Sequence, residues 1–235
     1  MRKSLGALVT AIAVMALLTT SVFAGTTSSL LGQQWRIFNA MPATKSFWDI
    51  NKVKLDANGA LTFPIAEFQG TSSGSFATYF MNNHNSDITG LTISATANWT
   101  GGSYETRVSS GGYGRVWFQD VTSGPYTSND YWWYSGQILD LNTATLTGSV
   151  TAPLIASANW TNICGQSALD TTPNPGPNCV GGTDPNVSPA DGFANAMKNV
   201  KQLGLSFGNN DGFAKGIALD NGTGTFSVTA FNLSQ

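Results

Sequence analysis

Apolar and polar residues alternate along most of this 235-residue chain, and short turn signals separate the alternating segments. In GYGRVWFQD, Val116 and Phe118 alternate with Arg115, Trp117 and Gln119. Successive side chains of a strand point to opposite faces, so this period of two predicts β-strands with one buried side. The other segments of this kind are QWRIFNA, KVKLD, ALTF, SFATYFMN, TGLTISATANW, YETRVS, DYWWY, TLTGSV, KQLGLSFG, GFAKGIALD and TGTFSVTAFNL. Many short strands with Gly, Asn and Asp turns between them predict an all-β fold, an antiparallel β-sandwich of the jelly-roll type.

One segment has the period of a helix instead. SPADGFANAMKNV begins with Ser188 and Pro189, residue types that are preferred at the N-cap and at the first helical position. Phe193, Met197 and Val200 then recur at the spacing of one helical face. We expect one short structural α-helix that lies across an end or an edge of the sandwich.

The N-terminus has the layout of a secretory signal peptide. A short basic start precedes an apolar stretch from Leu5 to Leu18, and a small-residue cleavage pattern ends at Ala24. The apolar stretch is shorter than the roughly 20 residues that span a bilayer. We expect a signal peptide over residues 1–24 and a single β-sandwich domain over residues 25–235, secreted to the periplasm or the extracellular space. A retained N-terminal anchor is the alternative.

The chain contains two cysteines, Cys164 and Cys179. In a chain that enters an oxidising compartment, a disulfide between them is the expected state. It would close a loop rich in Pro, Gly and Asn and stabilise the fold by about 3 kcal/mol on the chain-entropy model. A catalytic or metal-binding thiol pair is the alternative, but no histidine lies nearby in the sequence.

The charge balance argues against nucleic acid as a partner. Without Arg2 and Lys3, the mature chain keeps 9 of the 11 basic residues against 13 acidic ones, a net charge of −4. Charged residues make up 10% of the chain, and no basic patch is present. Phosphate binding needs clustered Lys and Arg. After the signal peptide, no segment is apolar enough to span a membrane.

Residues for catalysis and for metal binding are sparse. His84 is the one histidine, in the turn-like MNNHNSD, and no nucleophile-elbow motif accompanies it. The two glutamates, Glu67 and Glu105, offer no obvious carboxyl pair for glycoside hydrolysis. We expect no catalytic residue and no cofactor. A structural calcium ion held by loop residues such as Asp170 and Asp191 is an alternative to their ordinary role in turns.

Aromatic and polar side chains share one predicted strand face. If Val116 and Phe118 face the core, the alternate residues of that strand face the other way. Sugar rings pack their C–H faces on aromatic rings, and their hydroxyls pair with Arg and amide groups. The segment YETRVS would add to this face as a hairpin neighbour across two glycines. Alternatively, a second layer covers this face, which would make Trp117 a core residue and Arg115 a buried partner.

The segment NDYWWYSGQ places four large aromatic residues in a row. Alternation puts Tyr131 and Trp133 on one side of a strand, and Trp132 and Tyr134 on the other. At most one pair can meet a ligand while the other pair fills the core. We choose Tyr131 and Trp133 as the outward pair. The predicted ligand-binding residues are therefore Arg107, Tyr113, Arg115, Trp117, Gln119, Tyr131 and Trp133.

Residues 76–235 resemble a family of β-jelly-roll domains in secreted bacterial proteins, of the galactose-binding-like or carbohydrate-binding-module-like kind. The resemblance lies in ANWTNICG, in the short helix after a Pro- and Gly-rich loop, in the strand DYWWY, and in VKQLGLSFG followed by GFAKGIALDNGTGTFSVTAF. It implies a jelly roll whose relatives often bind carbohydrate or calcium.

The leading hypothesis is a secreted, non-catalytic carbohydrate-binding protein that uses aromatic, Arg and Gln side chains on a sheet face. Its partner would be a polysaccharide or another glycan. A structural or adhesive protein of the cell surface or extracellular matrix is one alternative, and a small secreted polysaccharide hydrolase is another. The sequence leaves the oligomeric state open.

Overall fold

The computed structural model describes most of the chain after the predicted signal peptide. Arg107, Cys179 and the predicted signal peptide lie outside the described residues. The described ranges are 26–40, 47–50, 53–67, 76–106, 111–122, 126–173, 186–209 and 215–235.

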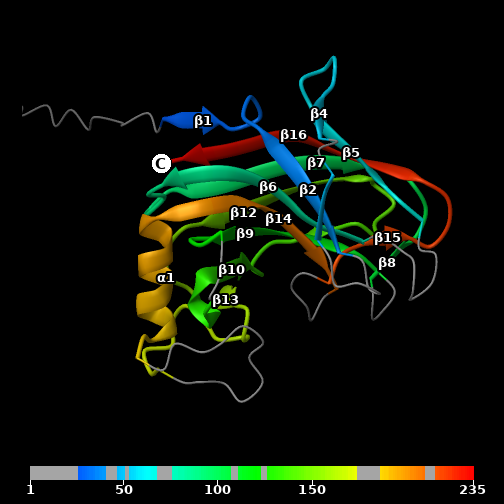
Figure 1. The fold of residues 1–235 in the computed structure, drawn as a ribbon. Coiled ribbons are helices and arrows are strands. Elements are labelled where there is room, and N and C mark those ends of the chain that lie inside the picture. Colours follow the sequence, from blue (N-terminus) through cyan, green and yellow to red (C-terminus); the bar gives the residue numbers. More distant parts are fainter. Residues whose placement is uncertain are drawn as a thin grey trace, which may run out of the picture.

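Most of the described strands form two facing antiparallel sheets, and two short strands form a third, two-stranded sheet; this confirms the predicted all-β sandwich (Figure 1). The six-stranded sheet has the order β12 (Thr147–Pro153), β7 (Thr92–Trp99), β16 (Gly224–Ser234), β5 (Leu61–Ile65) and β4 (Lys54–Leu55), with β1 (Thr27–Ser29) paired to β16. The eight-stranded sheet has the order β13 (Trp160–Asn162), β10 (Tyr131–Tyr134), β9 (Tyr113–Gln119), β14 (Val200–Gly208), β6 (Phe76–Ser86), β2 (Trp35–Ala40) and β3 (Phe47–Ile50), with β11 (Leu139–Asp140) paired to β9.

The core between the sheets is rich in aromatic rings. Phe63 of the six-stranded sheet stacks on Phe80 of the eight-stranded sheet, with ring centroids 5.5 Å apart. Trp35 stacks on Phe80 at 4.3 Å, and Phe207 meets Phe226 edge to face at 5.1 Å. Each large apolar side chain buried in this way stabilises the fold by about 2–3 kcal/mol.

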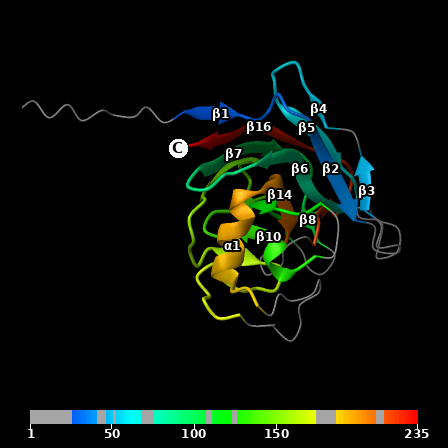
Figure 2. The same cartoon turned by 60° about the vertical axis from the view of Figure 1, so that its left-hand side comes forward.

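One helix, α1 (Pro189–Lys198), packs across an end of the sandwich, as the sequence predicts; Figure 2 shows it in front of β10 and β14. Ser188 is its N-cap, and the Ser188 Oγ accepts a hydrogen bond from the Asp191 backbone N at 3.1 Å. Phe193 is fully buried. Its ring meets the rings of Trp132 at 5.0 Å and Trp160 at 5.5 Å. The helix therefore closes the core beside β10.

Two expectations about local structure are wrong. The described part of the segment YETRVS, β8 (Tyr104–Glu105), does not pair with β9, whose described partners are β10, β11 and β14. Strand β8 pairs instead with β15 (Ala218–Leu219). His84 lies within β6 and is half-buried rather than in a solvated turn, and this burial lowers the pKa of its imidazole.

Gly204 allows β14 to approach β6 closely. A Cβ atom on Gly204 would lie 1.9 Å from the carbonyl oxygen of Phe80. We expect Gly204→Ala to lower the free energy of unfolding by about 2–3 kcal/mol, because the two strands must separate to accommodate the methyl group. Urea denaturation measures the change.

The matched control is Gly32→Ala. No atom lies within 4 Å of a Cβ at Gly32, so this variant should change the free energy of unfolding by less than about 1 kcal/mol. Equal stabilities of the two variants would contradict the close approach of β14 and β6.

Candidate functional site

The candidate site lies on the face of the eight-stranded sheet that points away from the sandwich core, which we call the outer face. The strand register brings several predicted site residues together there. Trp133 of β10 lies opposite Trp117 of β9, and Tyr131 lies opposite Gln119. Gln119 in turn lies opposite Gln202 of β14. The alternation in the sequence predicts this arrangement, because it places Trp117 and Gln119 on one face of their strand and Tyr131 and Trp133 on one face of theirs.

Strand β10 divides its four aromatic residues between the two faces. Trp132 and Tyr134 are buried, whereas Tyr131 and Trp133 are only partly buried. The Trp132 indole Nε1 donates to the Asn129 carbonyl oxygen at 2.6 Å, which holds this ring on the core side. The outward pair is therefore Tyr131 and Trp133, as expected.

Three predicted site residues are buried, so their expected exposure is wrong. Trp117 is 0% exposed, Arg115 4% and Gln119 6%. Gly204 separates Trp117 from β6 and carries no side chain. The Tyr79 ring of β6 lies 4.6 Å from the Trp117 ring. Trp117 is thus a covered residue of the outer face that lies beside Trp133, rather than a surface for ligand.

Arg115 is engaged within the fold. Its Nη1 donates to the Asn209 carbonyl oxygen at 2.9 Å, and its guanidinium lies 5.8 Å from the centre of the half-buried Tyr113 ring. Both residues lie toward the opposite end of β9 from Gln119. The structure therefore does not bring Arg115 or Tyr113 to the aromatic pair of β10.

A row of side-chain amides crosses three strands beside Tyr131. The Gln119 Nε2 donates to the Gln202 Oε1 at 2.6 Å, and the Gln202 Nε2 donates to the Asn83 Oδ1 at 2.9 Å. Gln119 is buried, Gln202 is half-buried and Asn83 is exposed. The row thus leads from the covered part of the outer face to solvent. Sequence reasoning missed Gln202 and Asn83, although Gln202 occupies a polar position in the alternation of KQLGLSFG.

Two carboxyl groups meet at the end of β9. Asp120 follows β9, and Asp130 belongs to the 3-10 helix η1 (Ser128–Asp130), which leads into β10. The Asp120 backbone N donates to the Asp130 carbonyl oxygen at 3.3 Å, so the two side chains start from neighbouring positions. Burial and then the charge of Asp130 raise the pKa of Asp120 to about 7. Asp120 therefore keeps its proton up to about neutral pH.

Tyrosine rings surround this end of the face. The Tyr126 side chain is 36% exposed, and its ring centre lies 5.4 Å from that of Tyr131. Burial, Tyr126 and the two nearby carboxyls all raise the pKa of Tyr131. Burial and the neighbouring Tyr131 likewise raise the pKa of Tyr79. These phenols stay protonated at neutral pH and can donate hydrogen bonds. No simple periodicity in the sequence identifies Tyr79, Tyr126 or the carboxyl pair.

Asn129 anchors η1 beneath the site. The Asn162 Nδ2 donates to the Asn129 Oδ1 at 3.2 Å, and the Asn129 Nδ2 donates to the Val187 carbonyl oxygen at 3.4 Å. Helix α1 meets this side chain at Gly192, where a Cβ would lie 2.4 Å from the Asn129 Cγ. These contacts fix the segment that carries Asp130 and Tyr131.

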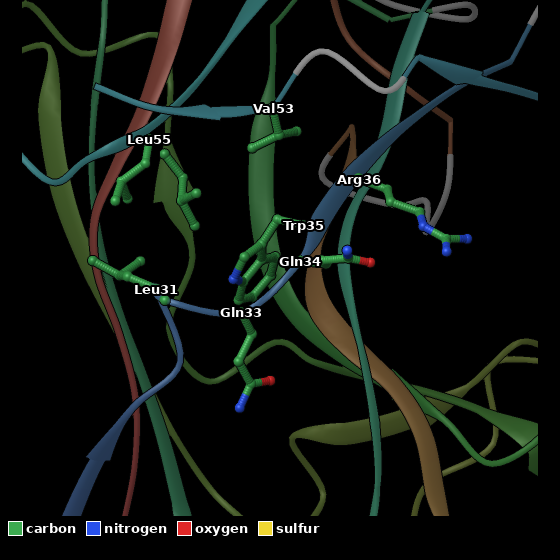
Figure 3. A pocket seen from close by; sticks show the side chains of 9 residues that line it. Leu31, Gln33, Gln34, Trp35, Arg36, Val53 and Leu55 are labelled. Carbon is green, nitrogen blue, oxygen red and sulfur yellow. The ribbon is translucent and has the colours of Figure 1, made fainter. Parts of the chain in front are cut away.

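A separate hollow of about 390 Å³ lies between β2 and the β4–β5 hairpin. Figure 3 shows Leu31, Val53 and Leu55 around Trp35, whereas Arg36 points away. Its walls thus combine aliphatic side chains with the amides of Gln33 and Gln34.

No group of three or more His, Cys, Asp or Glu side chains among the described residues is arranged to hold a metal ion. Within the same ranges, no helix is long and apolar enough to cross a membrane. Because Cys179 lies outside the described residues, the disulfide between Cys164 and Cys179 stays a prediction.

The chain matches no protein-family model and no curated protein. Among solved structures, it is similar to a variant of LamA from Z. galactanivorans in complex with laminaritriose and laminaritetraose. The TM-score is 0.42 at 10% identity, over 89% of this chain and 95% of that chain.

Two further solved structures are similar to the chain. One comes from work on endo-acting O-glycanases of the human gut microbiota in mucin breakdown, with a TM-score of 0.35 at 10% identity over 85% of this chain and 90% of that chain. The other is a botulinum neurotoxin type C structure from work on its interaction with two ganglioside molecules. It has a TM-score of 0.31 at 8% identity over 84% of this chain and 47% of that chain. TM-scores below 0.5 decide nothing about the ligand of this chain.

The proton on Asp120 makes the stability of the fold depend on pH. The pKa of Asp120 is raised from 3.8 to about 7 in the folded state. Its stabilising contribution is therefore complete below about pH 4 and is lost as the pH rises through 7. Allowing for partial exposure, we expect a loss of about 1–2 kcal/mol between pH 5 and 8. Thermal unfolding as a function of pH measures this loss.

Asp120→Asn should abolish this part of the pH dependence. The variant is compared directly with the wild type because both proteins keep His84, whose pKa is lowered by burial and whose titration therefore contributes equally to both profiles. Parallel pH profiles of the two proteins would show that the titration of Asp120 does not cause the pH dependence.

Replacement of the two tryptophans of β10 by alanine should lower the free energy of unfolding by very different amounts. We expect Trp132→Ala to lower the free energy of unfolding by about 3–5 kcal/mol, because it empties a packed site and leaves the Asn129 carbonyl without its donor. Trp133→Ala should cost less than about 2 kcal/mol, since its side chain is only partly buried. Equal losses, measured by urea denaturation, would contradict the assignment of faces.

Proposed function

We propose that this chain is a secreted, non-catalytic carbohydrate-binding protein that holds a polysaccharide or another glycan against Tyr131 and Trp133. The observation that carries the proposal is the partial exposure of these two rings on one face of β10, next to a row of amides. Large aromatic side chains on a solvent-facing sheet surface are typical of interaction sites.

The spacing of the two rings suits a chain of sugars. Tyr131 and Trp133 are two positions apart on one strand, which places them about 6.5–7 Å apart along β10. Neighbouring sugar rings of a glycan could therefore pack on both. We call the pair of Tyr131 and Trp133 rings the platform. Trp117 lies opposite Trp133 and supports it from the adjacent strand, so the platform is held in place before a ligand arrives. Such preorganisation lowers the entropy lost on binding.

The polar groups around the rings match the hydroxyls of a sugar. The amides of Gln202 and Asn83 offer donors and acceptors, and the hydroxyls of Tyr126 and Tyr131 add further groups of both kinds. These side chains come from three strands and from the segment before η1, so their positions depend on the whole sheet. Tyr113 remains part of the proposal only as a residue of a longer surface, and Arg107, which lies outside the described residues, stays a predicted ligand-binding residue.

Strand edges give little support to the alternative of a self-associating matrix protein. At the β12 edge of the six-stranded sheet, the Gln137 Oε1 accepts the hydrogen bond of the Thr151 backbone N at 2.8 Å. Pro153, at the end of the same strand, has no N–H to donate. Both features hinder the addition of another strand at this edge.

Glycan-array binding of the mature chain, residues 25–235, tests the proposal, with and without added calcium. We expect at least one glycan to bind, and Trp133→Ala and Tyr131→Ala each to weaken that binding about tenfold or more, as for central aromatic residues of other interfaces.

Ile155→Ala is the matched control, because Ile155 is 60% exposed just after β12 and lies outside the aromatic and amide cluster. Its affinity should equal that of the wild type. Absence of binding to every glycan would overturn the proposed function. Binding that survives both aromatic substitutions would move the site away from β10.

A further inference from the structure

We propose that the outer face selects uncharged glycans, and that the Asp120–Asp130 pair is the specificity-determining element that disfavours carboxylated and sulfated ones. The inference rests on the proposed function and specifies the chemical class of its ligand. The carboxyl pair is not a binding site by itself. Its effect depends on its place beside the aromatic rings.

The groups that would meet a ligand at the aromatic pair are neutral. They are the amides of Gln202 and Asn83 and the phenol hydroxyls of Tyr126 and Tyr131. Neutral amides and phenols pair well with sugar hydroxyls, but they lack the positive charge that compensates a carboxylate or a sulfate when it loses water. The platform therefore offers an anionic sugar no gain over a neutral one.

Cations of the described part of the sheet lie away from the platform or are already engaged. Arg115 is buried and donates to Asn209. Arg36 lies on β2, four strands from β10, which is about 19 Å along the sheet. Neither guanidinium is placed to pair with an anion on Trp133.

The carboxyl pair brings negative charge to the platform instead. Asp120 loses its proton as the pH rises through about 7, so it adds negative charge beside Asp130 at the pH of the assay. Asp130 immediately precedes Tyr131, and both carboxyls interact electrostatically with the Tyr131 phenol. An acidic sugar bound over Tyr131 would therefore lie close to a like charge.

Lys201 offsets this charge only in part. Its charge lowers the pKa of Asp120, but burial and the charge of Asp130 raise that pKa by more. Its ammonium donates to the Asn199 Oδ1 at 2.7 Å, which holds the cation at the turn before β14. The local balance at Tyr131 remains unfavourable for an anion.

Matched pairs of polymers test the inference. The probes are soluble glucan, galactan, mannan and xylan, each as the neutral polymer and as its carboxymethyl derivative. Affinity electrophoresis at pH 8 compares the two forms of each backbone. We expect the wild type to bind the neutral form at least about fivefold more tightly than the charged form.

Asp120→Asn and Asp130→Asn should each reduce this ratio to about twofold or less. Asp220→Asn is the control, because Asp220 is exposed in the turn after β15 and its replacement removes the same unit of net charge far from the platform. Its ratio should stay at the wild-type value. A smaller ratio in this control too would indicate an effect of net charge and would overturn the role of the pair.

Salt provides a second measurement that needs no variant. Raising the ionic strength from about 0.02 to 0.5 M screens repulsion between exposed charges, so the wild-type ratio should shrink. Equal binding of neutral and charged polymers at low salt, with Trp133→Ala still abolishing both, would overturn the inference and leave the proposed function standing. Absence of binding to all probes in both forms would overturn both.

Discussion

The contact between Trp132 and Phe193 determines which face of β10 meets solvent. This strand has only four residues, and all four are large aromatics, so its own composition does not decide between the two orientations. The Trp132 ring meets Phe193 of α1 edge to face, and its indole N–H is bound to Asn129. With Trp132 held inside, alternation places Tyr131 and Trp133 outside. The candidate site therefore depends on a helix that contributes no side chain to its surface.

The polar half of the site depends on the same end of the molecule. Asn129 joins η1 to β13 and to the segment before α1, and η1 carries Asp130 directly into Tyr131. The carboxyl pair is thus part of the connection between β9 and β10 rather than an isolated surface feature. Its charge and the orientation of the aromatic platform belong to one structural unit.

Local patterns in the sequence predicted the strands, the helix with its Ser188 cap and the two faces of β9 and β10, because each follows from spacing within a few residues. The pairing of β8 with β15 could not be predicted in this way, since the two segments are more than 100 positions apart in the numbering. The burial of Trp117 could not be predicted from local patterns either. It depends on Tyr79 reaching across Gly204, a relation among three strands that no single segment records.

The missing side chain at Gly204 has a consequence for how such a protein can change. It lets Tyr79 and Trp117 pack against each other beside Trp133, and this contact does not involve the rings of Tyr126 and Tyr131. Tyr126, Tyr131 and Trp133 can then be exchanged for other residues while the contact between Tyr79 and Trp117 stays constant. A family of related chains could diversify its ligands at these three positions and keep one scaffold.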